Sequence, residues 1–161
     1  MKEKKFLDTV SDDIIMIEDA YKLYLEKNQN IPPPWVWSSL CRVYTMMAIL
    51  EIEFFIEDVM EKTEIEGDSW KKKIEEIVKK SLNRSNVPRE LMIPEKIDKF
   101  ICLRELRHYI IHTDINDKTI ECLRRLGLTT DIEKYGEKEF KIIKKVRTDM
   151  INLIGMSNAL L

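Results

Sequence analysis

The sequence predicts an all-α fold, a mostly antiparallel bundle of about five to six helices. Glycine and proline are scarce, with four and five residues, and this scarcity favours long helices over many short strands. Apolar side chains recur at helical spacing in successive stretches, and no stretch has a convincing strand pattern. A chain of 161 residues, 44% of them hydrophobic, can bury a real core. We therefore expect a single domain over residues 1–161.

The first two expected helices are joined by a proline-rich loop. Helical spacing covers residues 6–27, and the segment 28–34 then stops the helix. Trp35 and Trp37 follow the prolines and predict an aromatic plug over one end of the core. The second helix, over residues 36–62, is apolar almost all round, which is typical of a central helix covered by several neighbours. The residues expected along the centre of its buried face are Leu40, Val43, Met47, Leu50 and Phe54.

One acidic residue of this central helix falls inside its apolar stripe. At about 100° per residue, Glu51 lies among apolar side chains, whereas Glu53 falls on a more polar side. A buried carboxylate needs a cationic partner, so we expect Glu51 to pair with Arg104 or Arg107. A structural ion pair explains Glu51 as well as a catalytic role does.

The third and fourth helices are expected between residues 68 and 114. Asp68 or Ser69 can cap the third helix, which reaches about residue 82. A polar loop follows, with room for a short helical turn around residues 89–92. Pro94 suits the first turn of the fourth helix, which ends near residues 113–114.

The last two helices have clear local signals. Asn116 or Asp117 can cap a fifth helix that reaches Leu126, and Gly127 closes it at its C-terminal end. After a loop, the sixth helix covers residues from about 137 to about 155.

The net charge of −2 is unevenly distributed along the chain. Residues 1–70 carry 7 basic and 15 acidic side chains, residues 71–107 carry 11 and 6, and residues 108–161 carry 9 and 8. The basic block in mid-chain is typical of a protein that binds a polyanion. A solvated helix face is the alternative, and lysine-rich blocks alone favour it.

Several classes of site and location are not expected. The three cysteines are widely spaced with no CxxC or Cys/His cluster, so they predict small buried hydrophobic residues in a reducing compartment. Glycine-rich phosphate loops and a GxSxG motif are absent from the sequence, and we expect no cofactor and no metal. The N-terminal residues lack the apolar core of a signal peptide, and no apolar run could span a bilayer. We expect a cytoplasmic protein without a membrane partner.

Both histidines lie in one stretch, residues 103–114. Arg104, Arg107, His108 and His112 stand there among apolar residues, which is costly unless the cations have partners or a function. Histidine exchanges protons near neutral pH, and arginine keeps its charge and can grip a phosphate through two donors. Groups of these two kinds can together exchange protons and stabilise negative charge on a phosphate.

The pattern Arg107-x4-His112, with His108 directly after the arginine, resembles the R-φ-x3-H signature of the HEPN superfamily. This superfamily comprises helical ribonucleases and nucleic-acid-associated proteins, and its φ residue is usually Asn, Asp or His. The motif lies late in a helix in the second half of an all-α chain, as it does in that superfamily. The resemblance implies that Arg107 and His112 are catalytic. His108, Arg104, Glu51 and Asp114 are the candidate supporting residues.

The resemblance also implies a homodimer. Residues five apart lie about 140° apart on a regular helix, so Arg107 and His112 do not share a narrow face. They can meet one phosphate if the helix is irregular near Asp114, or if two subunits share the site. In the HEPN family the two motifs typically face each other across a dimer cleft. Ile101 and Ile111 beside the motif would be covered in such a dimer.

The resemblance thus implies a metal-independent endoribonuclease of toxin or defence type. Such cleavage needs a base for the ribose 2′-OH, an acid for the leaving oxygen and a cation for the phosphorane. RNA is the expected substrate, with products that carry 2′,3′-cyclic phosphate ends, and an antitoxin or a neighbouring nucleotidyltransferase-type protein is a candidate partner. Some HEPN toxins carry a tyrosine, modified by that partner, where this chain has Asp114, so that route of regulation is not favoured.

Two alternatives stay open. The chain could be a catalytically silent HEPN module that binds RNA or nucleotide beside a partner protein. It could also be a plain helical interaction protein whose Arg/His cluster is a polar network. For His112 alone, a C-terminal helix cap is the simpler role.

Overall fold

The computed structural model describes residues 2–28, 33–84 and 93–160, and in these ranges the chain is helical without strands. The expected all-α bundle is therefore confirmed for the described residues. The elements are α1 (Lys2–Lys27), α2 (Pro34–Thr63), α3 (Trp70–Arg84), α4 (Ile93–His112), α5 (Asp117–Leu126), a short 3₁₀ turn η1 (Ile132–Lys134) and α6 (Glu137–Leu160).

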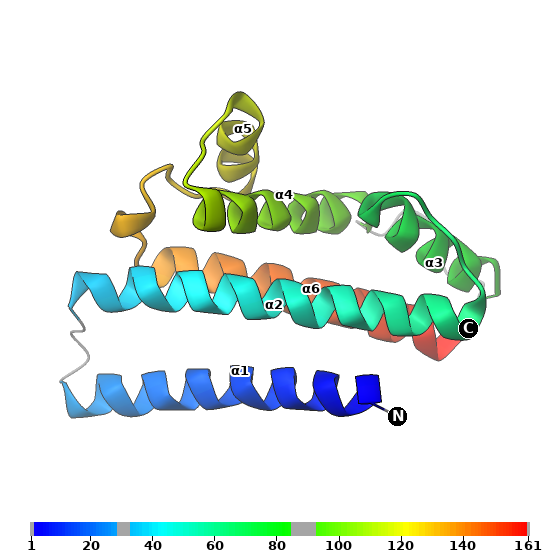
Figure 1. Ribbon diagram of the computed structural model, residues 1–161, viewed down its shortest axis with the longest axis horizontal. Helices are drawn as coiled ribbons and strands as arrows, with labels where there is room; N and C mark the ends of the chain where they lie inside the picture. The colour runs from blue at the N-terminus through cyan, green and yellow to red at the C-terminus, as the bar shows by residue number, and fades with distance from the viewer. Residues whose placement is uncertain (1, 29–32, 85–92, 161) are drawn as a thin grey trace.

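The long helices lie lengthwise beside one another (Figure 1). Helices α2 and α6 run in the same direction, and α1 and α4 run opposite to them on either side. Helix α5 stands on the outer side of α4, and α3 packs beside the C-terminal part of α6. No helix in the described part of the chain has the length and apolar character needed to cross a membrane.

Helix α2 is the central element, in contact with α1, α3, α4 and α6, as its apolar sequence predicts. Its fully buried side chains include Tyr44, Ala48, Ile52 and Ile56. The face expected from the sequence was wrong in rotation, because Val43, placed at its centre, is 49% exposed. A helix that is apolar on all sides has no polar face to fix its rotation, so the neighbouring helices decide which side is buried.

The helix ends follow local signals closely where such signals exist. Asn116 caps α5 by accepting a hydrogen bond from the backbone N–H of Thr119 at 2.9 Å, and Gly127 closes the helix with φ of 76°. Helix α6 continues past its expected end because Gly155 fits within the helix, against the ring of Phe55. The helical turn expected around residues 89–92 lies outside the described residues.

The aromatic plug was predicted correctly for one tryptophan. The Trp37 ring packs at 4.6 Å from that of Tyr21 and 5.9 Å from that of Phe140, measured between centroids. Trp35 is instead 65% exposed. This aromatic contact joins α1, α2 and α6 at one end of the bundle.

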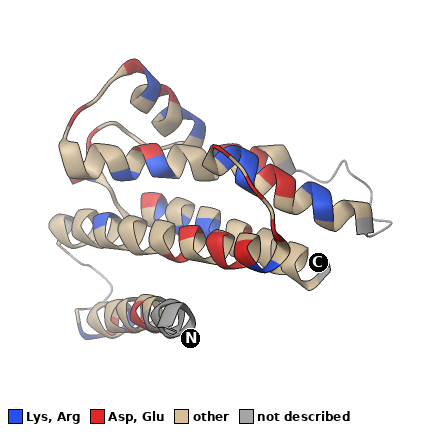
Figure 2. Cartoon of the chain, turned by 45° about the vertical axis from the view of Figure 1, so that its right-hand side comes forward, with Lys and Arg blue, Asp and Glu red and all other residues tan. Residues whose placement is uncertain are grey.

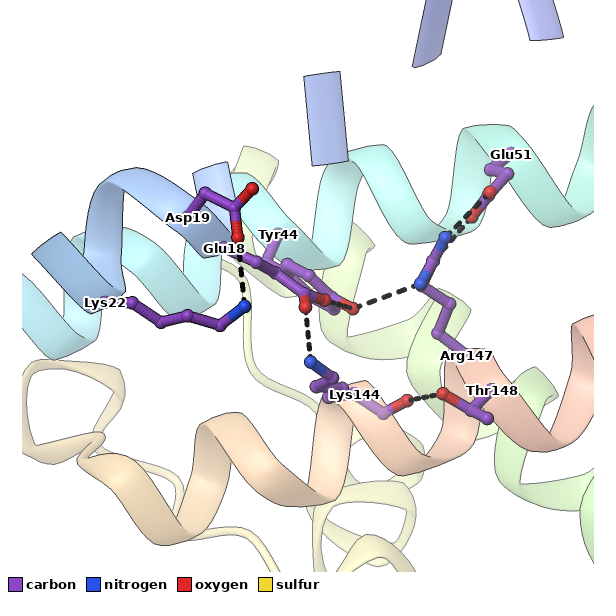
Figure 3. Close-up of polar contacts among 8 residues, drawn as sticks. All are labelled: Glu18, Asp19, Lys22, Tyr44, Glu51, Lys144, Arg147 and Thr148. Atoms are coloured by element: carbon purple, nitrogen blue, oxygen red, sulfur yellow. Dashed lines mark hydrogen bonds and ion pairs between the residues drawn. The ribbon is translucent and has the colours of Figure 1, made fainter. Parts of the chain in front are cut away.

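A polar network joins the same three helices further along (Figure 3). Glu51 is buried, as expected, but its partner is Arg147 of α6. Arg147 donates two hydrogen bonds to the Glu51 carboxylate, at 2.5 and 2.8 Å, and Ser11 of α1 donates a third at 2.8 Å. The expected pairing with Arg104 or Arg107 was wrong, because the side of α2 that carries Glu51 meets α6 and α1.

The network continues toward the aromatic contact. The Tyr44 hydroxyl donates to Glu18 at 2.9 Å, accepts from Arg147 at 3.5 Å, and Lys144 forms an ion pair with Glu18. Burial alone would raise the pKa of Glu18. The hydrogen bonds from Lys144 and Tyr44, with the charges of Lys144 and Arg147, outweigh it and lower the pKa. Glu18 therefore stays ionised at neutral pH and helps to hold α1 on the bundle.

We predict that Glu51→Ala lowers the free energy of unfolding by about 3–5 kcal/mol, because it leaves the Arg147 guanidinium buried without its carboxylate. The double variant Glu51→Leu with Arg147→Met should recover most of this loss, because it removes both charges and keeps the volume. Urea denaturation followed by circular dichroism measures both. The exposed pair Asp19–Lys22 provides the control, since Lys22→Ala should change the midpoint little. A Glu51→Ala midpoint equal to that of Lys22→Ala would contradict the prediction.

Candidate functional site

The arginines of the candidate site are held by a carboxylate of α2. Arg104 Nε donates to Glu53 Oε1 at 2.6 Å, and Arg107 Nη1 donates to Glu53 Oε2 at 3.2 Å. The Glu53 side chain is 14% exposed, and those of Arg104 and Arg107 are 31% and 30% exposed. Glu53, expected on a more polar side of α2, is thus the acidic residue that faces the motif helix.

Arg104 has a second contact that fixes its position. Its guanidinium carbon lies 5.0 Å from the centroid of the Trp70 ring at the start of α3, within cation–π range. Arg104 is therefore held between a carboxylate and an aromatic ring. Arg107 has the Glu53 contact through a single nitrogen, and a guanidinium carries five N–H donors.

The two histidines lie together on the outside of α4. His108 and His112 are both exposed, one turn apart, and their ring centroids are 4.5 Å apart with an interplanar angle of 45°. Two imidazoles at this separation can act on the same small group, one as a proton donor and the other as a proton acceptor.

Helix α4 stays regular through His112, and the irregular backbone near Asp114 begins after it, so this irregularity does not bring Arg107 and His112 together. The helix is α-helical through His112, and the Thr113 N–H donates to the Tyr109 carbonyl at 2.8 Å. Because the backbone leaves the helical conformation at Thr113, after both residues, Arg107 and His112 point about 140° apart around the helix axis. Within one subunit, Arg107 and His112 therefore project from different faces of α4.

The backbone directly after His112 is strained. Thr113 has φ of 53°, in the left-handed region that a β-branched residue rarely adopts. Among the residues that the structure describes, Glu64 is the other non-glycine residue with positive φ. Strain of this kind persists where the surroundings fix the backbone, and it gathers at functional sites. Here the Tyr109 hydroxyl, which donates to the Thr130 carbonyl at 3.0 Å, ties the end of α4 to the segment that precedes η1.

The structure therefore divides the predicted site residues into three places. Arg104 and Arg107 meet at Glu53, and His108 and His112 form an exposed pair. Glu51 belongs to the network with Arg147, and Asp114 is exposed beyond the end of α4.

Glu53 is the residue that the sequence did not identify. The available signal was the three-residue spacing of Arg104 and Arg107, which puts both on one helix face and predicts a shared acidic partner. To identify Glu53 rather than Glu51 as that partner, one must know how α2 is rotated relative to α4, and no local sequence pattern gives this rotation.

The basic block of residues 71–107 is largely paired. Figure 2 shows acidic residues along the C-terminal half of α2 and basic residues on α3. Lys73 pairs with Glu57 across these helices at 2.5 Å, and Lys71 pairs with Asp98 at 2.8 Å. Such pairs reduce the local positive potential, which favours the alternative of a solvated helix face.

Other candidate groups are poorly suited to catalysis. Burial raises the pKa of the Cys41 thiol to about 12, and burial with a hydrogen bond to Cys122 does the same for Cys102, so both stay protonated. A hollow of about 710 Å³ near the end of α2 is lined mainly by acidic residues, which would repel RNA. Nowhere in residues 2–28, 33–84 and 93–160 do three or more His, Cys, Asp or Glu side chains gather as a metal site.

Comparison with known proteins adds no family. A scan against protein-family models, a search of curated proteins and a search of solved structures each gave no match. The resemblance to the HEPN superfamily therefore rests on the motif between Arg107 and His112 and on the helical architecture.

We predict that Thr113→Asn raises the free energy of unfolding by about 1 kcal/mol, because asparagine adopts the left-handed region at lower cost. Thr148→Asn is the matched control. Thr148 lies inside α6, and threonine and asparagine have similar helix propensities. Chemical denaturation measures both variants. Equal stabilities for the two would show that Thr113 is not strained.

Proposed function

We propose that the protein is a metal-independent endoribonuclease that acts on RNA as a homodimer in the cytoplasm. The observation that carries this proposal is the exposed His108–His112 pair at the end of α4, on the helix that also carries Arg107. One imidazole would take the proton of the ribose 2′-OH, and the other would protonate the leaving 5′-oxygen. The product would be a 2′,3′-cyclic phosphate.

Arg107 would stabilise the negative charge of the phosphorane. It is 30% exposed and contacts Glu53 through one nitrogen, so further N–H donors are available to phosphate oxygens. The Glu53 carboxylate would then act as a positioning group that holds the guanidinium in place. Arg104 contacts Glu53 and the Trp70 ring, so its main role would be to hold the Glu53 carboxylate in position.

The regular geometry of α4 supports the proposed dimer. Because Arg107 and His112 point to different sides of α4, a second subunit is the way to bring an arginine and a histidine to one phosphate. Ile111 and Ile115, beside His112, are 48% and 41% exposed and would be covered in such an interface. Ile101, also expected there, instead packs against the core of its own subunit. An antitoxin or a nucleotidyltransferase-type partner remains part of this proposal, with Asp114 in place of the modified tyrosine.

A second candidate is a helical interaction protein without catalysis, and one observation favours it. Glu53 gives both arginines a structural partner, since each guanidinium donates a hydrogen bond to its carboxylate in a half-buried position. The histidines would then only complement the negative end of the α4 dipole. A silent module that binds RNA without cleaving it lies between the two candidates, and the experiment below separates all three.

We predict that His112→Ala and Arg107→Ala each lower the rate of RNA cleavage by about 10²–10⁴-fold in EDTA, with helical content unchanged. The assay incubates purified protein with total RNA and follows the formation of cyclic phosphate ends. The losses in the double variant should not add, because both residues would act on one phosphate.

Arg104→Ala is the matched control for Arg107→Ala. It removes the shorter contact to the same carboxylate, so a merely structural cluster would make it the more damaging change. Cleavage that is unchanged in His112→Ala would refute the proposed mechanism. RNA binding without cleavage would favour the silent module, and neither binding nor cleavage would favour the interaction protein.

We predict a dimer at micromolar concentration, measured by light scattering after size-exclusion chromatography. Ile111→Glu should shift the protein to monomer, because it puts a charge into the apolar interface. Ile15→Glu on α1, where Ile15 is 56% exposed, should leave the dimer intact. A wild-type protein that is entirely monomeric would count against the shared site.

A further inference from the structure

The His108–His112 pair has a sequence spacing and a ring separation close to those of a metal chelate. The two residues are four apart on a regular helix, which places their side chains on one face. An ion held at about 2.1 Å by one nitrogen of each ring would put the ring centroids about 4.6 Å apart at the angle of about 90° that Cu²⁺ and Ni²⁺ favour, and about 5.3 Å apart at the tetrahedral angle of Zn²⁺. The observed separation of the centroids is 4.5 Å. Both rings are exposed, so the small χ2 rotations needed for coordination meet little resistance.

We propose that His108 and His112 chelate one first-row transition-metal ion of the Zn²⁺, Ni²⁺ or Cu²⁺ type. Imidazole nitrogen is a preferred ligand for these ions. Helical zinc motifs use the same four-residue spacing for two of their ligands. The position at the C-terminal end of α4 adds to the attraction, because the helix dipole is negative there.

The site would be open and its metal exchangeable. No third His, Cys, Asp or Glu side chain of the described residues completes a cluster around the pair, so water would fill the remaining positions. The ion would therefore bind more weakly than a structural zinc ion, and a chelator such as EDTA would remove it.

Metal binding would also control the reaction, a consequence that rests on the proposed ribonuclease function. Coordination uses the nitrogen lone pairs that proton transfer needs, so a bound ion would inhibit cleavage and EDTA would restore it. Binding itself is measured without RNA, so it succeeds or fails independently of any cleavage activity.

The test titrates the tag-free protein with Zn²⁺ and follows the imidazole signals by NMR. The chain contains two histidines, so each signal reports on one member of the pair. We expect both to shift together and to saturate at one ion per chain, and we expect Zn²⁺ to raise the melting temperature. Calorimetry with Ni²⁺ gives the affinity. His108→Gln and His112→Gln should each weaken it by about 10-fold or more, since even indirect partners of a metal contribute this much.

A spacing control keeps the number of histidines constant. The double variant His108→Gln with Ile111→His has two adjacent histidines, which point about 100° apart and cannot close one chelate. It should bind as weakly as the single variants. The proposal fails if any of these variants binds Zn²⁺ as tightly as the wild-type chain, if no shift occurs at millimolar Zn²⁺, or if one ion bridges two chains. The thiols of Cys41 and Cys102 do not compete, because burial keeps them protonated.

Discussion

Two carboxylates of α2 hold the long helices of this protein in their relative positions. Glu51 and Glu53 are two residues apart, so they project about 160° apart around the helix axis. Glu51 binds Arg147 of α6 and Ser11 of α1, and Glu53 binds the arginines of α4. Each carboxylate pairs with arginine side chains that would otherwise be buried or half-buried without an acidic partner. The positions of these ion pairs fix the rotation of α2.

The candidate site depends on the second of these carboxylates. Glu53 sets the face of α4 that turns inward with Arg104 and Arg107, and the histidines consequently turn outward. The same interaction therefore gives the arginines a structural role and exposes the imidazoles for chemistry or for metal. A structural and a functional explanation of the motif are compatible here, and for the two arginines the difference between Arg104→Ala and Arg107→Ala separates them.

The sequence predicted best where the signal is local. The cap at Asn116 and the stop at Gly127 each depend on a few neighbouring residues, and both were correct. The burial of Glu51 was also correct, but its partner was not, because the partner depends on how α2 is rotated against α4 and α6. The exposure of Val43 has the same cause, since an apolar helix contains no pattern that marks its outer side. The strain at Thr113 left no sequence signal, because threonine is uncommon in that conformation.

The distance along the chain between Glu51 and Arg147 has a consequence during synthesis. The two residues are 96 positions apart, so α1 and α2 leave the ribosome long before Arg147 exists. Until α6 is synthesised, the apolar sides of α2 that α4 and α6 cover in the folded protein stay exposed. The Glu51 carboxylate stays hydrated during this time. Non-local contacts of this kind form late, and exposed apolar surface invites aggregation in the meantime. The N-terminal half of this chain is therefore the part most exposed to aggregation before the last helix closes the bundle.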